Sequence, residues 1–215
     1  MFVRDFMTKN PITILGKANI LDADKKMLSH KVHRLLVVDE KGSLVGVVTD
    51  GDIKRAMPSV ATTLDKFEIN YLLGKIKVAS IMSIAPLTTL PDATIEEAAT
   101  IMYKNHIGGL AVLDEDKKIV GIITETDIFK VFVDTMGMFE GKIRVSVEIP
   151  DKVGQLAILT GVFRDMGMNI SSIVCTPLPD GMRITVVRAS SLQETDLLKE
   201  KLEQEGFKVK HIQNF

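Results

Sequence analysis

The chain has 215 residues, of which 46% are hydrophobic and 26% charged, which is enough to bury the cores of two modest domains. Its formal net charge of −1 creates no overall attraction to nucleic acid or anionic membrane, and no apolar run approaches the ~20 residues of a membrane-spanning helix. The single cysteine, Cys175, excludes an intramolecular disulfide, and because the N-terminus does not resemble a signal peptide we expect a cytoplasmic protein.

The first part of the chain contains two copies of one unit. Between Val3 and Ile53, 18 of 51 positions match the residue 75 places further on, without a gap. Each copy predicts an extended segment after a proline, a helix, two very apolar strands around a tight turn, and a second helix. In the first copy these lie at 11–14, 20–27, 35–38 and 44–48, with the second helix beginning at Asp50. The second copy repeats them, and its last helix is predicted from Glu125 to Met136.

A different pattern follows the two copies. It predicts a strand, a helix, two strands, a helix and a strand, at 144–149, 154–166, 169–176, 182–188, 192–205 and 207–212. This is the βαββαβ order of a ferredoxin-like sandwich. A further amphipathic helix is predicted between the copies, at 64–75. We therefore expect an α+β protein with a first repeat at 1–60, a linker helix at 61–77, a second repeat at 78–137 and a separate domain at 143–215.

The sequence Gly-x-x-Thr-x-x-Asp occurs at the same place in both copies, where the last strand meets the following helix. The candidate binding residues are Thr49 with Asp52, and Thr124 with Asp127. A hydroxyl at the strand end and a carboxylate in the first helical turn point to the same side and suit a ribose diol. The same residues also serve as ordinary helix caps, so both interpretations stand, although the recurrence favours a binding role.

The two copies resemble a pair of cystathionine-β-synthase (CBS) domains over residues 1–137. The segment Asp39–Ile53 and its counterpart carry the resemblance. It implies two clefts for adenosine-containing ligands: AMP, ADP or ATP first, with S-adenosylmethionine or NADH as further candidates. In those clefts Asp52 and Asp127 would bond the ribose, Thr49 and Thr124 the ribose or phosphate. The segments around Thr13 and Thr88 would line the adenine pocket.

The resemblance also implies a phosphate-binding role for His33 and Arg34, on the strand beside Thr49. The planar guanidinium group suits phosphate oxygens. Gly108 and Gly109 stand at the corresponding positions of the second copy, so we expect the first cleft to be the better site for a phosphorylated ligand. An exposed, non-binding pair is the alternative. Arg55 and Lys130, three residues beyond each aspartate, are additional phosphate candidates or solvated helical charges.

The C-terminal part resembles the ACT domain, a small-molecule regulatory module, over residues 143–215. The matching segments are Ile149–Leu156 and Gly167–Ile170. In amino-acid-binding members the ligand sits at this turn, which would involve Asp151, Gly154 and Asn169 here. The alternative is that these residues form only the turn and the core.

Two CBS repeats followed by an ACT domain resemble the acetoin utilisation protein AcuB family. This implies a regulatory protein that senses adenine nucleotides, linked to acetoin or acetyl-CoA metabolism, homodimeric and acting on a metabolic enzyme partner. A non-catalytic dimerisation scaffold, or a regulatory subunit of a separate enzyme or transporter, is the alternative. No catalytic constellation occurs, and the four histidines lack partners at metal-ligand spacing, so we expect neither enzymatic activity nor a metal site.

Overall fold

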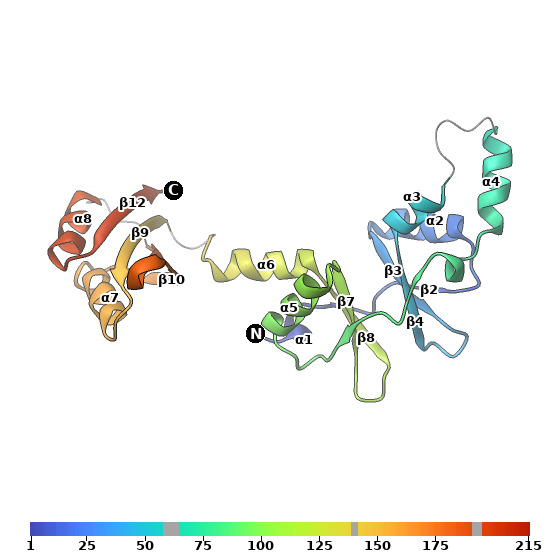
Figure 1. Cartoon of the computed structure of the whole chain (residues 1–215), viewed down its shortest axis with the longest axis horizontal. Helices are drawn as coiled ribbons and strands as arrows, with labels where there is room; N and C mark the ends of the chain where they lie inside the picture. Colours follow the sequence, from blue (N-terminus) through green and yellow to red (C-terminus); the bar gives the residue numbers. More distant parts are fainter. Residues whose placement is uncertain (58–64, 139–141, 191–194) are drawn as a thin grey trace. The chain divides into compact units, whose positions relative to one another are not determined.

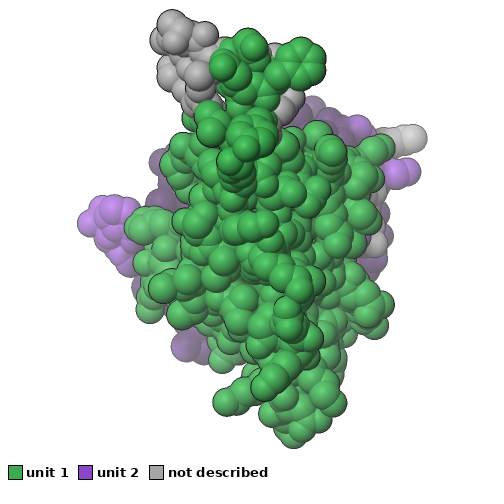
Figure 2. Space-filling view, turned by 90° about the vertical axis from the view of Figure 1, so that its right-hand side faces the viewer, with its two compact units in different colours: residues 1–128 green, residues 129–215 purple. Residues whose placement is uncertain are grey.

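The computed structural model of the chain describes residues 1–57, 65–138, 142–190 and 195–215. It divides into two compact units, Met1–Ile128 and Phe129–Phe215, drawn as a ribbon in Figure 1 and in separate colours in Figure 2. Residues 61–64 of the predicted linker helix and 192–194 of the predicted last helix lie outside the described residues. Within them, no helix has both the length and the apolar character that a bilayer crossing requires.

The first copy of the repeat folds in the predicted order. Asn19 caps the first long helix by accepting a hydrogen bond from the backbone N–H of Asp22, and Lys31, in the left-handed conformation, ends it. The elements are α1 (Val3–Phe6), β1 (Thr8–Lys9), β2 (Thr13–Leu15), α2 (Ile20–His30), β3 (Arg34–Val38), β4 (Leu44–Thr49), α3 (Asp50–Ala56) and, in the linker, α4 (Lys66–Lys75).

The second copy repeats this arrangement. Thr94 and Glu97 form the predicted capping box at the start of its first long helix. Its elements are η1 (Val78–Ser80), β5 (Ser83–Ile84), β6 (Thr88–Thr89), α5 (Ile95–Asn105), β7 (Gly109–Leu113), β8 (Ile119–Thr124) and α6 (Glu125–Thr135). The predicted helix end is confirmed to within one residue, since α6 stops at Thr135 and Gly137 adopts a φ of 64°.

The two copies complete each other's sheets, which the sequence analysis did not predict. One sheet has the order β2-β3-β4-β5 and the other β1-β8-β7-β6. Strand β5 belongs to the second copy but pairs with β4 of the first, and β1 of the first copy pairs with β8 of the second. Each copy therefore adds one short strand to the sheet of the other, and each needs the other to complete its sheet.

The exchange of strands explains the glycine of the recurring motif. A methyl group on Gly46 would lie 2.5 Å from the sulfur of Met82 and 2.9 Å from the backbone oxygen of Ser83. A methyl group on Gly121 would lie 2.5 Å from the sulfur of Met7 and 3.2 Å from the backbone oxygen of Thr8. The glycine is thus required for packing, because the exchanged segment passes directly over it.

The cores follow the apolar patterns of the strands and helices. Residues 35–38 of β3 are all buried, in agreement with the prediction of strands covered on both faces. Met27 of α2, Leu35 of β3 and Val48 of β4 belong to one buried cluster. In Figure 1, α2 and α3 lie beside each other at one end of strands β3 and β4.

The second unit contains the predicted ferredoxin-like domain. Its elements are β9 (Ile143–Pro150), α7 (Gln155–Asp165), β10 (Ile170–Pro177), η2 (Pro179–Gly181), β11 (Met182–Ala189), α8 (Thr195–Gln204) and β12 (Lys208–Asn214). The antiparallel sheet has the order β10-β11-β9-β12, and the βαββαβ prediction is confirmed. Alternate residues of β9 are fully buried against the helices, whose contributions to the core include Phe163 and Leu202.

Candidate functional site

The Thr–Asp pair of the first copy forms a closed hydrogen-bonded turn between β4 and α3. Thr49 donates to Oδ2 of Asp52 from its backbone N–H at 2.8 Å and from its hydroxyl at 2.7 Å. The backbone N–H of Asp52 donates back to the Thr49 hydroxyl at 3.2 Å. Asp52 is 9% exposed, so its carboxylate is held in one orientation by these bonds.

The second copy has the same turn between β8 and α6. Thr124 donates to Oδ2 of Asp127 from its backbone N–H and from its hydroxyl, both at 2.8 Å. In both copies the cap therefore uses Oδ2 alone. Oδ1 of Asp52 accepts a hydrogen bond from Arg55, whereas Oδ1 of Asp127 has no partner among the described residues. Capping and ligand binding are thus compatible roles for the two aspartates, because each uses a different carboxylate oxygen.

Asp52 lies in a cleft of about 390 Å³, which we call the Asp52 cleft. Its size falls within the range of about 300–1,000 Å³ usual for small-molecule sites. Arg34, Val47, Thr49, Asp52 and Arg55 come from the first copy. The remaining lining residues come from the second copy, namely 83–87 and 106–109.

Asp127 lies in a smaller cleft of about 270 Å³, the Asp127 cleft. The second copy supplies Ile122, Thr124, Thr126 and Asp127. The first copy supplies Thr8, residues 10–12 and residues 32–34. Each Thr–Asp pair therefore faces chain segments of the other copy.

This arrangement corrects the expected grouping of the phosphate candidates. His33 lines the Asp127 cleft, not the Asp52 cleft that contains Thr49, while Arg34 lines both. Gly108 and Gly109 line the Asp52 cleft. The register does place Arg34 opposite Thr49 in the sheet, as the sequence analysis assumed. The grouping fails because the clefts form between the copies, so a strand start faces the aspartate of the other repeat.

Three further predicted residues lie elsewhere. Thr13 lines a separate hollow beside the two strand turns, and Thr88 is exposed and is not among the residues that line either cleft. Lys130 is exposed on α6 beyond Ile128, in the second unit. The neighbouring segments 10–12 and 84–87 line the two clefts, whereas the two threonines themselves do not. Pro11 and Pro86 lie within these segments and recur at matching positions of the repeat.

The charges around the clefts are distributed unequally. Asp50 carries a lowered pKa, chiefly because Lys54 donates a hydrogen bond to it at 3.0 Å, and His33 lies 3.7 Å from the same carboxylate. Its counterpart Glu125 forms no ion pair in the described part of the chain. Burial lowers the pKa of Arg34, while Glu125, Asp50 and Asp127 act in the opposite direction. The positive charge of Arg34 is therefore partly removed from solvent and surrounded by acids.

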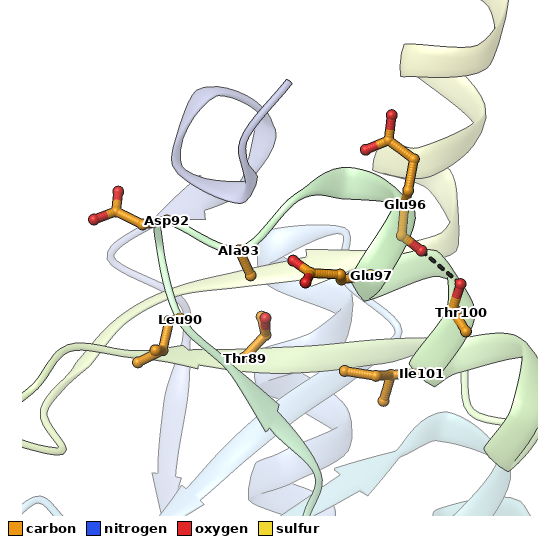
Figure 3. A pocket seen from close by; sticks show the side chains of 8 residues that line it. All are labelled: Thr89, Leu90, Asp92, Ala93, Glu96, Glu97, Thr100 and Ile101. Carbon is orange, nitrogen blue, oxygen red and sulfur yellow. Dashed lines mark hydrogen bonds between the residues drawn. The ribbon is translucent and has the colours of Figure 1, made fainter.

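A larger hollow of about 690 Å³ lies beside the start of α5 (Figure 3). Three carboxylates, Asp92, Glu96 and Glu97, line it together with apolar and threonine side chains, and no cationic side chain does. Glu97 is held by the capping box with Thr94, whose backbone N–H and hydroxyl lower its pKa. This concentration of negative charge repels a phosphate group, so the hollow does not suit a nucleotide.

The predicted ACT site lies at the turn between β9 and α7. Arg183 donates from Nε to Asp151 at 2.7 Å, and this hydrogen bond lowers the pKa of the Asp151 carboxyl. Gly154 has a φ of 88° at the start of α7, which explains the glycine. Asn169 is exposed, and its backbone is hydrogen bonded to Ser190. Asp151 is thus already paired within the domain, and an amino-acid ligand remains a prediction.

Comparison with known families assigns both regions. The CBS domain family matches residues 3–59 and 78–134, and the ACT domain family matches residues 143–207. A CBS domain-containing protein of Dictyostelium discoideum is 31% identical over 136 residues, which is 63% of this chain and 94% of that protein. An L-aspartate semialdehyde sulfurtransferase of Methanocaldococcus jannaschii is 32% identical over 130 residues, 60% of this chain. The matched region spans only 23% of the sulfurtransferase.

Solved structures match the first unit. The CBS domain pair of protein MJ0100, in complex with 5′-methylthioadenosine and S-adenosyl-L-methionine, is 31% identical with a TM-score of 0.52 and covers 61% of this chain and 95% of that one. CBSX2 in complex with AMP is 28% identical with a TM-score of 0.50, covering 61% and 96%. A protein of Vibrio cholerae described as an acetoin utilization protein (AcuB) is 27% identical with a TM-score of 0.53, covering 65% and 96%.

Proposed function

Because this chain belongs to the CBS-domain family and carries an ACT domain after its CBS pair, we propose that it is a regulatory protein that binds adenosine-containing ligands in the Asp52 and Asp127 clefts. One observation carries the proposal. Each cleft combines a Thr–Asp pair from one copy with wall segments from the other, so a ligand in either cleft contacts both copies.

The chemistry of the walls suits an adenosine moiety. Oδ1 of each aspartate can accept hydrogen bonds from ribose hydroxyls, while the Oδ2 bonds to the threonine keep the carboxylate in place. The segments 84–87 and 10–12 offer apolar and backbone groups to a base. Arg34, with Arg55 in one cleft, supplies positive charge for phosphate groups, and His33 adds an imidazole in the other cleft.

The ligands of related proteins indicate which adenosine-containing compounds to consider. CBS pairs similar to this one have been solved with 5′-methylthioadenosine and S-adenosyl-L-methionine, and with AMP. We propose AMP, ADP or ATP as ligands with a phosphate and S-adenosylmethionine as a ligand without one, and NADH is a further candidate. The resemblance to the acetoin utilization protein supports a role in acetoin metabolism.

Regulation would follow from the position of the ligand between the copies. A ligand that contacts both copies favours the relative arrangement in which its contacts are best, and shifts the equilibrium by its differential affinity. The ACT domain or a partner protein could respond to this change in the arrangement of the two copies. The region of the sulfurtransferase relative that matches this chain forms part of a longer enzyme, which supports a second candidate: a regulatory subunit for a separate metabolic enzyme.

Isothermal titration calorimetry on the full chain with AMP, ADP, ATP, S-adenosylmethionine, NADH and adenosine tests the proposal. The double variant Asp52→Asn, Asp127→Asn is expected to weaken the binding of every ligand by about 10- to 100-fold per cleft, because each loses charge-assisted hydrogen bonds to the ribose. Asp134→Asn, which changes an exposed aspartate of α6, is the matched control and is expected to bind as the wild type. Wild-type protein that binds none of these ligands, or a double variant that binds them all normally, contradicts the proposal.

A further inference from the structure

The guanidinium group of Arg34 lies against the backbone of Gly108 and Gly109. A methyl group on Gly108 would lie 2.6 Å from one terminal nitrogen of Arg34, and a methyl group on Gly109 would lie 2.5 Å from the other. Both glycines therefore leave open the space that Arg34 occupies. Neither has a positive φ, so the backbone conformation itself does not require glycine at these positions.

The position of Arg34 has a specific relation to the repeat. Gly109 is the residue 75 places after Arg34, so the arginine of the first copy lies against its own counterpart in the second. The first carbon of a side chain at 109 would lie 2.5 Å from Arg34 and 3.0 Å from the backbone oxygen of Ile123, so the guanidinium group would have to move. Arg34 therefore occupies the space that a side chain at position 109 would need.

Arg34 borders both clefts from this central position. It lines the Asp52 cleft and also the Asp127 cleft. No hydrogen bond or ion pair with the described part of the chain holds its guanidinium group, although Asp50, Glu125 and Asp127 are near enough to act on its charge. A half-buried cation without a fixed partner is available to an anion that enters from either side.

We propose that Arg34 is a single phosphate-binding residue shared by the two clefts, so that a phosphorylated ligand in one cleft weakens the binding of a second phosphorylated ligand in the other. Ligands without a phosphate group bind the two clefts independently. The inference rests on the proposed function, because it assumes that adenosine ligands occupy the clefts, and it adds the coupling between them.

The coupling has a simple physical origin. A guanidinium group forms its two parallel hydrogen bonds with one phosphate at a time. The second phosphate then meets only the local side chain of its own cleft, the Arg55 cation or the His33 imidazole, and lies near a charge of its own sign. The lost charge-assisted bonds correspond to about 10- to 100-fold in affinity. By thermodynamic linkage the effect is the same whichever cleft fills first.

Single-cleft variants make the coupling measurable by calorimetry. Asp52→Asn leaves the Asp127 cleft intact, and Asp127→Asn leaves the Asp52 cleft intact, so each reports the affinity of one cleft for AMP with Arg34 available. In the wild type the second AMP is expected to bind about 10- to 100-fold more weakly than a single AMP binds to whichever of these two variants has the lower affinity. We call this difference in affinity the gap. Adenosine is expected to show no such loss.

Arg34→Gln is expected to remove this gap for AMP, and urea denaturation of the variant checks that it folds. Arg34→Lys keeps the positive charge but cannot form the two parallel hydrogen bonds of a guanidinium group, so it is expected to retain part of the gap. Arg164→Gln removes an exposed arginine of α7 and serves as the control. Independent binding of two AMP molecules by the wild type, or a gap that survives Arg34→Gln, overturns the shared role of Arg34. If adenosine also fails to bind the wild type, the proposed function itself is overturned.

Discussion

The Asp52 and Asp127 clefts are built on the same motif and yet differ in what surrounds it. In both, the threonine holds Oδ2 of the aspartate in nearly identical hydrogen bonds. Oδ1 of Asp52 accepts a hydrogen bond from Arg55, whereas Oδ1 of Asp127 has no partner among the described residues. The other copy contributes Gly108 and Gly109 to the Asp52 cleft, and it contributes His33 and Arg34 to the Asp127 cleft. The comparison teaches that the character of each cleft depends on the other copy of the repeat.

The largest expected difference concerns the stability of the exchanged strands. Gly46→Ala is expected to lower the free energy of unfolding by about 1–3 kcal/mol, because its methyl group meets Met82 and the backbone of β5. Gly121→Ala is expected to cost less, since the nearest backbone oxygen is 3.2 Å away and not 2.9 Å. Chemical denaturation of the two variants measures the difference.

Gly74→Ala is the control for these variants. This glycine lies on α4, and the nearest atom to its methyl position is 4.0 Å away. The added methyl group is therefore expected to leave stability unchanged or to raise it slightly, because alanine favours the helix. Equal and negligible costs at Gly46 and Gly121 would show that the exchanged segments do not lie against the motif glycines.

A smaller effect is expected from Arg55, which is bonded to Asp52 and has no equivalent bond at Asp127 among the described residues. Arg55→Ala is expected to strengthen adenosine binding in the Asp52 cleft by about two- to fivefold, because an exposed ion pair no longer competes for Oδ1. The same variant is expected to weaken AMP binding there, since a cation near the phosphate is lost. Calorimetry in an Asp127→Asn background isolates this cleft. Parallel changes for both ligands would mean that Arg55 does not distinguish ribose from phosphate.

The smallest expected effect is on the pH dependence of stability. The lowered pKa of Asp50 means that its contribution is present above the ordinary value of 3.8 and is lost as the pH falls through the lowered value of the folded state. Its side chain is 38% exposed, so solvent screening keeps the contribution below about 1 kcal/mol. Asp50→Asn is expected to flatten the stability curve slightly in this acidic range, as measured by urea denaturation. An unchanged curve would indicate that the bond to Lys54 does not stabilise the fold.

The sequence predicted the elements of both copies and of the ACT domain because local signals determine them. Apolar spacing marked α2 and α5, and the capping pair Thr94 and Glu97 marked a helix start that the structure confirms. The exchange of β1 and β5 was not predictable in this way. Each is a two-residue strand, and its partner lies in the other copy, so no local pattern identifies the pairing.

The site could be predicted only in part for the same reason. The pairs Thr49–Asp52 and Thr124–Asp127 are recognisable because all their atoms come from one short segment. Much of each wall comes from the other copy, so His33 lies in the Asp127 cleft and not in the cleft of Thr49. Thr13 and Thr88 line neither cleft, although the segments beside them do. The contact of Arg34 with Gly108 and Gly109 also joins the two copies, so it could not be predicted from either copy alone.

The stoichiometry of adenosine binding, measured by calorimetry on the full chain, tests the central claim most directly. The account predicts two adenosine molecules per wild-type chain, one for Asp52→Asn, one for Asp127→Asn and none within the measured range for the double variant. A wild-type chain that binds no adenosine, or an unchanged stoichiometry in both single variants, would contradict the assignment of the two clefts as adenosine sites.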